Sequence, residues 1–290
     1  MSVKSFIKCT PLYPIIVKMK NSVPDSLYIW GQYIHRLHKV PNLIHPKDFN
    51  EKMCYFKLHN TGKKFSILCD KYEVREYVKA KIGEQYLIPI IGCWDSVEDI
   101  PWESLPKSFV LKPTHDSGSV VICKDKSKLD IEHVKQKLLQ ALKTNYYYVD
   151  RERPYKDVKP RIIAEKLLDD RIVDYKFYVF NGEPKYLYVG QGLVADHSLR
   201  ISFYDMDGKL APFKRMDYPG LDDNFVMPEN FDEMKKIAGI LSDGLPFVRV
   251  DLYSVLGEIY FSEITLTPAG GHMPFSPKKY DRILGDMIHM

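Results

Sequence analysis

One arginine and two carboxylates near the C-terminus have the types and spacing that suit phosphate chemistry. Arg249 and Asp251 stand two residues apart, and Glu263 follows twelve residues after the aspartate. Apolar residues alternate with the first two, as in a half-buried strand, and a turn at 256–258 leads to a second apolar run that carries Glu263. Two carboxylates on adjacent strands repel each other unless a cation lies between them, and Mg²⁺ binds carboxylates together with substrate phosphates. A surface hairpin with a solvated charged face is the equally open alternative.

The bulk composition predicts a folded globular protein. The chain has 290 residues, of which 45% are hydrophobic and 28% charged, so it can form one large domain or two to three small lobes. No run approaches the ~18 apolar residues of a membrane span, and the N-terminus lacks a signal peptide's apolar core, so we expect a cytoplasmic protein. The formal charge of +4 suits an anionic ligand but is too small to indicate nucleic acid. Five scattered cysteines without a CxxC pair argue against disulfides and a zinc site.

Hydrophobic periodicity places these residues among alternating helices and strands. Helices are predicted at 26–38, 48–58, 70–83, 129–143, 230–242 and 280–288, with Asp48 or Asn50 as N-cap of the second and Asp70 as N-cap of the third. Strands are predicted at 65–69, 86–91, 109–113, 120–123, 161–168, 174–180, 185–190 and in the two segments of the C-terminal hairpin. Residues 145–160 are predicted to be a loop, and residues 200–225 are predicted to form a further strand, a turn at Asp207-Gly208 and a long loop.

A polar turn at 114–119 separates two of these strands. Such a turn can close over phosphates with backbone N–H groups directed at the anion. It contains a single glycine, so a plain β-hairpin is the better interpretation without further context.

Taken in order, these segments resemble the ATP-grasp superfamily, and more narrowly its teichuronopeptide-biosynthesis (TupA-like) branch, which often occurs in surface-polysaccharide clusters. The resemblance covers roughly residues 45–290. It rests on Phe-Asn-Glu-Lys at 49–52, Asp-Lys-Tyr-x-Val-Arg-x-Tyr-Val at 70–78, Phe-Val-Leu-Lys-Pro at 109–113, Ile-Ile-Ala-Glu at 162–165, Asp-Tyr-Lys-Phe at 174–177 and Val-Asp-Leu-Tyr at 250–253.

The resemblance implies an α+β ATP-grasp fold, in which two α+β lobes grip the nucleotide between antiparallel sheets. The expected parts are an N-terminal helical lead-in at 1–62, a pre-grasp α/β part at 63–108, a small lobe with the phosphate-lid hairpin at 109–168, and a large lobe with the metal site at 169–290.

It also implies roles for individual residues around ATP and Mg²⁺. Two lysines would neutralise the α- and β-phosphates, the turn would cover them, and the segment after Glu165 would contact adenine. The implied nucleotide-binding residues are Lys71, Lys112, His115, Ser117, Gly118, Glu165, Lys166, Leu168 and Asp174. Asp174 would reach the ribose or support Lys176, a phosphate-facing catalytic group, and Arg249 would stabilise charge on the reaction intermediate.

The metal ligands implied by the resemblance are Asp251, Glu263 and Thr265. Related ligases usually carry asparagine two residues after the metal-binding glutamate, and this chain has Thr265 there. A hydroxyl ligates magnesium more weakly than a carboxamide oxygen, which puts a second metal site in doubt.

The implied reaction is ATP-dependent ligation of a carboxylate and an amine through an acyl phosphate. The branch suggests a small-molecule or saccharide-linked carboxylate, such as a uronic acid, and loops 151–161 and 272–279 are candidate acceptor surfaces. A peripheral place in a polysaccharide-assembly complex stays open, as do three other functions. These are a glycosyltransferase with Asp205 and Asp207 as metal ligands, a phosphotransferase, and a nucleotide-binding partner without activity. Arg249, Asp251 and Glu263 argue against the partner without activity, because an inactive site does not need unpaired charges in a sheet.

Overall fold

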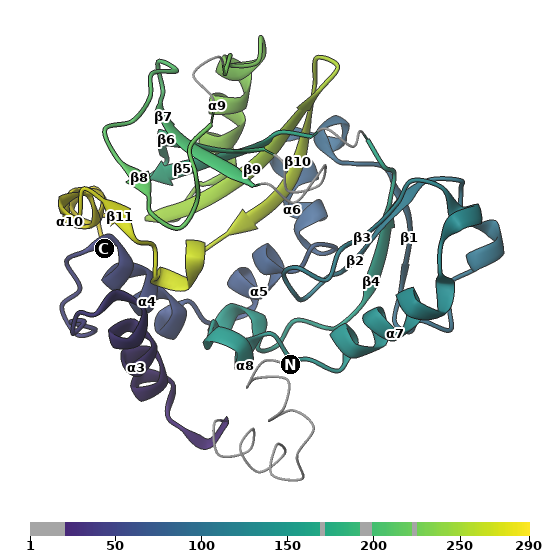
Figure 1. Ribbon diagram of the computed structural model, residues 1–290, viewed down its shortest axis with the longest axis horizontal. Coiled ribbons are helices and arrows are strands. Elements are labelled where there is room, and N and C mark those ends of the chain that lie inside the picture. Colours follow the sequence, from purple (N-terminus) through teal and green to yellow (C-terminus); the bar gives the residue numbers. More distant parts are fainter. Residues whose placement is uncertain (1–20, 169–171, 192–198, 222–224) are drawn as a thin grey trace.

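The computed structural model describes residues 21–168, 172–191, 199–221 and 225–290. Over these ranges two antiparallel sheets form the framework, and the helices α3, α4 and α10 gather beside the larger one (Figure 1). The chain is therefore an α+β protein with antiparallel sheets, as predicted. The proposed division into four parts places its last boundary at 168/169, next to residues outside these ranges, and the first 20 residues of the N-terminal lead-in also lie outside them.

The larger sheet has five strands in the order β10-β9-β5-β6-β7. Their bounds are β5 Asp174–Phe180, β6 Glu183–Gln191, β7 Arg200–Asp205, β9 Phe247–Val255 and β10 Glu258–Thr265. On one face, Val248, Val250 and Leu252 pack in a core that includes α9, Phe231–Leu241. An aromatic core with Phe49 and Tyr178 covers part of the other face. Because Val248, Val250 and Leu252 occupy one face of β9, Arg249 and Asp251 lie on the other face.

The smaller sheet has four strands in the order β1-β4-β2-β3. Their bounds are β1 Ile90–Trp94, β2 Phe109–Pro113, β3 Val121–Cys123 and β4 Ile162–Glu165. Leu111 and Ala164 share a core with Val134 and Leu138 of α7, Ile131–Leu142. Because successive side chains of a strand point to opposite faces, Lys112 lies on the face of β2 opposite Leu111.

The remaining elements connect and cover the sheets. The helices are α3 Asp25–Leu37, α4 Phe49–His59, α5 Lys63–Cys69, α6 Val74–Ile82, α8 Tyr147–Asp150 and α10 Lys279–Asp286. The 3₁₀ turns are Glu84–Tyr86, Trp102–Ser104, Lys126–Lys128, Arg153–Tyr155 and Pro268–Gly271, and β8 Lys214–Arg215 pairs with β11 Phe275–Ser276.

Helix α4 is attached to the C-terminal segment by polar contacts. The Asn50 side chain donates to the Met273 carbonyl at 2.9 Å and accepts from the Met273 N–H at 2.7 Å. The Lys52 ammonium donates to the carbonyls of Gly285 and Ile288 at 2.8 and 2.7 Å. These bonds satisfy buried groups on α4 with partners more than 220 residues away.

Most predicted helices are confirmed, and several local predictions are wrong. Asp48 is the N-cap of α4, and its N–H donates to Glu51 as in a capping box. Residues 65–69 are helical in α5, because a short apolar run fits either a strand or a buried helix. Helix α6 begins at Val74 rather than at residue 70, since Asp70 accepts from the N–H groups of Tyr72 and Glu73 in a preceding turn.

Three strand and loop boundaries also differ from the predictions. The strand expected at 86–91 begins at Ile90, after a 3₁₀ turn at 84–86. The strand expected at 161–168 is β4, which ends at Glu165. The predicted loop at 145–160 contains α8 and a further 3₁₀ turn.

A bulge in β10 aligns the C-terminal hairpin. Phe261 faces Leu252 and Glu263 faces Asp251, so Ser262 is one extra residue in this strand. Without it, Phe261 and Glu263 would continue one alternation on one face. The bulge lets Phe261 stay in the core while Glu263 lies beside Asp251.

The turn of this hairpin offers a test of the fold. Leu256 and Gly257 have φ of 53° and 84°, the left-handed pair of a type I′ turn, and the Leu256 side chain is 97% exposed. Because asparagine adopts this conformation more readily than leucine, Leu256→Asn should raise the free energy of unfolding by about 1 kcal/mol. Chemical denaturation measures this value. A stability equal to that of Leu256→Ala would contradict the assigned turn.

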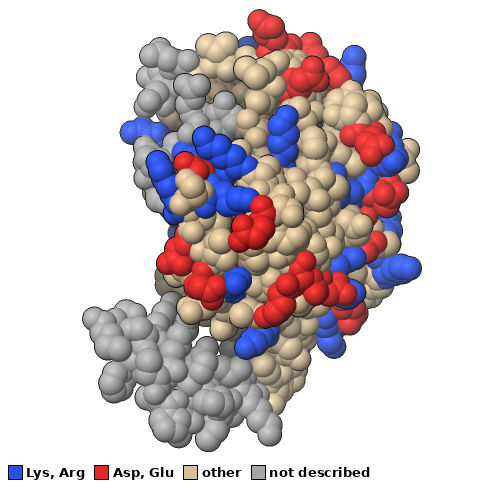
Figure 2. All heavy atoms as spheres, turned by 90° about the vertical axis from the view of Figure 1, so that its right-hand side faces the viewer, with Lys and Arg blue, Asp and Glu red and all other residues tan. Residues whose placement is uncertain are grey.

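Charged side chains on one face of the molecule and the described cysteines bear on the composition-based predictions. Basic and acidic side chains are interspersed on the face shown in Figure 2, in keeping with the modest formal charge of +4. Within the described ranges, no helix combines the length and apolar character needed to cross a membrane. The four cysteines in these ranges are free thiols, and Cys9 lies outside them.

Candidate active site

The arginine and carboxylates singled out in the sequence form one charged cluster on β5, β9 and β10. Arg249 donates to both oxygens of Asp251, at 2.7 and 2.6 Å, and to Glu263 Oε1 at 2.8 Å. Lys176, opposite Asp251 on β5, donates to Asp251 Oδ2 at 2.7 Å and lies 3.5 Å from Asp174. Three neighbouring strands therefore bring these five charged side chains into one network of contacts.

The Asp251 carboxylate already has its charge balanced within the protein. It is fully buried, and both of its oxygens accept from Arg249 or Lys176. The two neighbouring carboxylates have a cation between them, as the sequence argument requires, and in this structure that cation is the Arg249 guanidinium. The magnesium ligands stay a prediction.

Glu263 is the more accessible carboxylate of the cluster. Its side chain is 37% exposed, and the bonds from Arg249 and Thr265 both end at Oε1. Burial acts to raise the pKa of Glu263, but positive charges nearby outweigh it, and the pKa falls to about 2. In order of effect, these charges belong to Arg249, Lys176 and Lys71. Glu263 is thus ionised near neutral pH and faces the basic groups that the sequence assigned to phosphates.

The oxygen atoms of Asp251, Glu263 and Thr265 fit a magnesium ion only if a phosphate supplies further ligands. Among the residues that the structure describes, no group of three or more His, Cys, Asp or Glu side chains could hold a metal by itself. Glu263 and the Thr265 hydroxyl offer oxygens on one side, with Asp251 behind them. Mg²⁺ bound to nucleotides commonly takes one or two carboxylates and completes its shell with phosphate oxygens and water.

Lys112 and Glu165 form a second charged group, on the smaller sheet. The Lys112 ammonium lies 2.7 Å from Glu165 Oε2 and forms an ion pair with it, but the angles do not meet those of a hydrogen bond. Arg75 lies 3.4 Å from Glu165 Oε1. Burial acts to lower the pKa of Lys112, but the carboxylate of Glu165 reverses the effect and the pKa is raised. Glu263 contributes to this shift too, which places the two sheets within electrostatic range of each other.

Lys71 lies against the turn at 114–119 predicted to cover phosphates. Its ammonium donates to the Asp116 carbonyl and its N–H donates to the Thr114 carbonyl at 3.0 Å. Ser117 and Gly118 are exposed at the tip, where Gly118 has a φ of 96°. His115 instead points inward and contacts the Ala141 carbonyl at 3.1 Å, so its ring is directed to α7.

The residues assigned to adenine and ribose lie at the end of β4 and the start of β5. Lys166 is exposed and its N–H donates to the Pro89 carbonyl at 2.9 Å. Leu168 is partly buried, and Asp174 stands beside Lys176 as described. These residues flank the gap in the described chain between 168 and 172.

A cavity of about 530 Å³ adjoins the charged cluster. Arg249, Glu263 and Thr265 are among the residues that line it. Its other charged and polar walls come from Arg36, Ser117, Asp150, Glu152, Arg215, Asp217, Thr267 and His272. The cavity therefore joins segments from the N-terminal helices, the middle of the chain and the C-terminal loop.

Gly270 shows how closely these segments approach. A Cβ at this position would lie 1.9 Å from Asp150 Oδ2, and its φ is 58°. Asp150 Oδ2 in turn accepts from Lys57, which is fully buried, at 2.7 Å. Only glycine leaves room for this buried ion pair.

Sequence reasoning missed most of the cavity lining, including Asp150, Glu152 and Thr267, and the buried Lys57 that pairs with Asp150 behind it. The signal that could have found them is weak: an Asp-x-Glu pair in the predicted loop and Thr-x-Thr after Glu263. Both loops suggested as acceptor surfaces line the cavity, 151–161 through Glu152 and Tyr155 and 272–279 through His272 and Pro274. The basic residues of 151–161 mainly bind elsewhere in the protein, with Arg153 paired to Asp25, Lys159 to Asp95, and Arg161 to Asp70 and Glu73.

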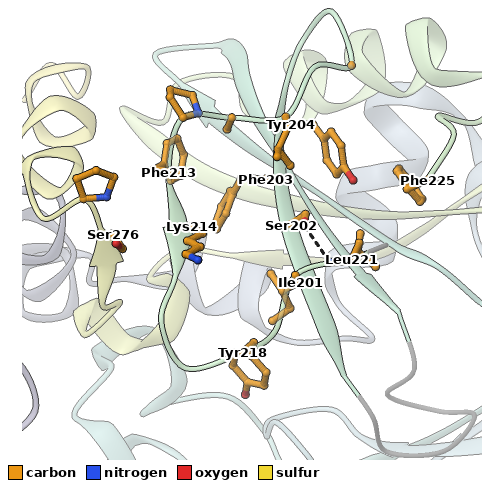
Figure 3. Close-up of a pocket in the computed structure, with 16 residues that line it drawn as sticks. Ile201, Ser202, Phe203, Tyr204, Phe213, Lys214, Tyr218, Leu221, Phe225 and Ser276 are labelled. Atoms are coloured by element: carbon orange, nitrogen blue, oxygen red, sulfur yellow. Dashed lines mark hydrogen bonds between the residues drawn. The ribbon is translucent and has the colours of Figure 1, made fainter. Parts of the chain in front are cut away.

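A second cavity, of about 590 Å³, lies along the edge strand β7 (Figure 3). Its walls are largely apolar and aromatic, and Lys214 is the one charged side chain among the described residues that line it. Ser202 accepts from the Leu221 N–H at 3.0 Å across its floor. None of its lining residues belongs to the charged cluster.

The Asp-x-Asp pair at the end of β7 forms a turn. Asp205 accepts from the N–H groups of Asp207 and Lys209 at 3.0 and 2.9 Å, and Gly208 has a φ of 79°. Asp205 Oδ1 thus stabilises the backbone of the turn, in agreement with the prediction of a hairpin turn at these residues.

A comparison with family models supports the family that the sequence resembles. The family model described as TupA-like ATPgrasp matches residues 51–289. No curated protein matches the chain. Similar solved structures include D-alanine–D-alanine ligase from Bacillus anthracis complexed with ATP (16% identity, 77% of this chain, 65% of that chain, TM-score 0.43). L-amino acid ligase from Bacillus licheniformis is 12% identical, with 85% of this chain and 55% of that chain covered and a TM-score of 0.46. N5-carboxyaminoimidazole synthetase from Staphylococcus aureus is 13% identical, with 70% of this chain and 45% of that chain covered and a TM-score of 0.38. Each match spans less than two thirds of the other protein.

Proposed function

The chain belongs to the TupA-like ATP-grasp family, and on that premise we propose that it is an ATP- and Mg²⁺-dependent carboxylate–amine ligase. One observation carries the proposal: Arg249, Lys176, Asp251 and Glu263 form a single cluster that opens into a cavity large enough for a small substrate. A ligase of this type needs positioned charges and no nucleophilic side chain.

The proposed nucleotide site lies between the two sheets. Lys112 and Lys71 would bind the phosphates, the turn at 114–119 would cover them, and residues 165–168 would contact adenine. Asp174 would reach the ribose or orient Lys176. Glu263, Thr265 and Asp251 would hold Mg²⁺, which when bound neutralises the charge of the transferred phosphoryl group.

The cavity beside the cluster is the proposed place for the carboxylate substrate. Arg249 lines this cavity and would stabilise the negative charge that develops when the carboxylate is phosphorylated and then attacked by an amine. A saccharide-linked carboxylate such as a uronic acid is the substrate class that the TupA-like branch suggests. An association with a polysaccharide-assembly complex belongs to the same proposal.

A thermal-shift panel with Mg·ATP, Mg·ADP, UDP and UDP-sugars tests the nucleotide. A ligand that binds only the native state raises the unfolding midpoint by several degrees at saturating excess. A shift with adenine nucleotides that requires magnesium supports the ligase and justifies measuring ADP release with uronic acids and amines. A shift with UDP compounds alone would replace the proposal with a glycosyltransferase.

Lys112 provides a direct test of the phosphate site. Lys112→Met should weaken ATP binding by about tenfold to a hundredfold, because a charged hydrogen bond contributes ~1.5–3 kcal/mol. Arg75 remains beside Glu165 in this variant, so the protein should stay folded. Calorimetric titration with ATP measures the affinity, and the exposed Lys107→Met is the matched control. Equal affinities in the two variants would exclude Lys112 from the site.

A further inference from the structure

The cavity beside the cluster contains two carboxylates that the nucleotide chemistry leaves unused. Asp150 and Glu152 stand two residues apart at the end of α8, and both line the cavity. Asp150 is 8% exposed; its Oδ2 binds Lys57, and its Oδ1 has no hydrogen-bond partner among the described residues. A buried carboxylate oxygen without a donor indicates that a ligand supplies one.

Glu152 has no cation of its own. Its Oε2 accepts a hydrogen bond from the Thr267 hydroxyl, and no Lys or Arg in the described ranges lies within ion-pair distance. The charged groups that face it are Lys57 on α4, Asp150 on α8 and Arg249 on β9. Burial raises the pKa of Glu152 to about 7; Asp150 adds to the rise, while Lys57, Thr267 and Arg249 oppose it.

Two other lining residues, Arg36 and His272, supply donors. Arg36 lies 3.3 Å from His272 Nδ1, and because a guanidinium can only donate, we assign the ring proton to Nε2. Burial, Lys57 and Arg36 lower the pKa of His272 to about 3, so the ring is neutral. His272 is 6% exposed and its Nε2 has no partner among the described residues. The cavity lining thus offers an unpartnered acceptor, Asp150 Oδ1, and an unpartnered donor, His272 Nε2.

We propose that Asp150 and Glu152 bind the ammonium group of the amine substrate, and that Glu152 accepts the proton which this group must lose before it attacks. An ammonium group has three donors and no acceptor, so it suits two carboxylates. His272 would donate to an oxygen of the same molecule. The substrate class is therefore a primary amine that carries a hydroxyl or carboxyl group, such as an amino acid or an amino sugar. This inference rests on the proposed ligase function.

The proton transfer completes a balanced reaction. Glu152 takes H⁺ from the ammonium, and the neutral nitrogen uses its lone pair to form a C–N bond with the acyl phosphate carbon. The C–O bond to phosphate then breaks, and inorganic phosphate leaves with that electron pair. The departing phosphate takes the second proton from the nitrogen, so that a neutral amide and HPO₄²⁻ remain. A general base contributes about 10²–10⁴-fold to such a step when its pKa lies near the working pH.

Binding of simple probes tests the ammonium site without any carboxylate substrate. The probes are three matched pairs at pH 7: ethanolamine and ethylene glycol, L-alanine and L-lactate, D-glucosamine and D-glucose. At least one amine should raise the unfolding midpoint by about 3 °C over its partner at tenfold excess over Kd. Glu152→Gln and Asp150→Asn should abolish the difference, and the exposed Glu132→Gln should retain it.

The outcomes separate this site from the nucleotide site. If no pair differs, or if Glu152→Gln keeps the difference, the ammonium site is wrong even where Mg·ATP binds. If an amine binds through Glu152 and Mg·ATP does not stabilise the protein, the site stands and the ligase function fails.

Hydroxylamine distinguishes proton acceptance from simple binding. It is largely unprotonated at neutral pH and needs no base, so a carboxylate that the enzyme activates should still be converted to its hydroxamate by Glu152→Gln. With an ammonium-form amine, the same variant should lose about 100-fold or more in kcat/KM. Equal losses with both nucleophiles would show that Glu152 acts only through the shape of the cavity.

Discussion

Replacing Glu263 by glutamine should remove the magnesium-dependent part of ATP binding and lower turnover by about 10²–10³-fold. This is the size of effect seen when one electrostatic contact to a developing charge is lost. The substitution keeps the shape of the side chain but removes the charge at the accessible end of the cluster, where the pKa of Glu263 is held at about 2. Thermal shifts with ATP, measured with magnesium and with EDTA, give the binding effect, and ADP release gives the rate.

The fold should survive this change. Arg249 keeps both bonds to Asp251, and Lys176 keeps its bond to the same carboxylate. Glu258→Gln, an exposed position on the same strand, is the control and should behave as the wild type. If Glu263→Gln retained a magnesium-dependent shift of normal size, the metal site would have to lie elsewhere.

Replacing Lys57 by methionine should destabilise the protein by about 3–5 kcal/mol, because it leaves the Asp150 carboxylate buried without a partner charge. Lys57 is fully buried and makes the 2.7 Å ion pair beside Gly270. For a chain of this size the loss corresponds to a midpoint lower by about 10 °C. Scanning calorimetry or urea denaturation measures it.

A second substitution tests whether the unpaired charge is the cause. Lys57→Met combined with Asp150→Leu removes both charges and should regain much of the lost stability, since a buried ion pair is often no better than an apolar pair. Lys63→Met, at an exposed position, is the matched control. Equal destabilisation in the single and double variants would assign the effect to lost packing.

The sequence was sufficient to predict the fold class and most of its elements. The period of β9 and the capping signals of α4 are local properties of the chain, and the structure has both. The ATP-grasp fold class, predicted from the order of the motifs, is confirmed by the family match over residues 51–289. Residues 65–69 were misassigned because five apolar-rich residues satisfy both periods, and contacts with β10 decide for the helix.

The candidate site was predictable only where its residues lie on regular strands. Arg249, Asp251 and Lys176 face one side because strands alternate. The bulge at Ser262 has no clear sequence signature, although it determines where Glu263 points. Lys57, Asp150 and His272 come from three distant segments, and no local pattern indicates that they meet.

The polar attachment of α4 has a consequence for the order in which the protein can be completed during synthesis. Asn50 and Lys52 bind carbonyl and N–H groups at 273, 285 and 288, and Lys57 needs Asp150. During synthesis, these polar groups of α4 therefore stay hydrated until the last strands and α10 have left the ribosome. The proposed substrate cavity, which α4 supports from behind through Lys57, would be assembled last. A nascent chain halted before residue 273 could form the smaller sheet but could not bind substrate.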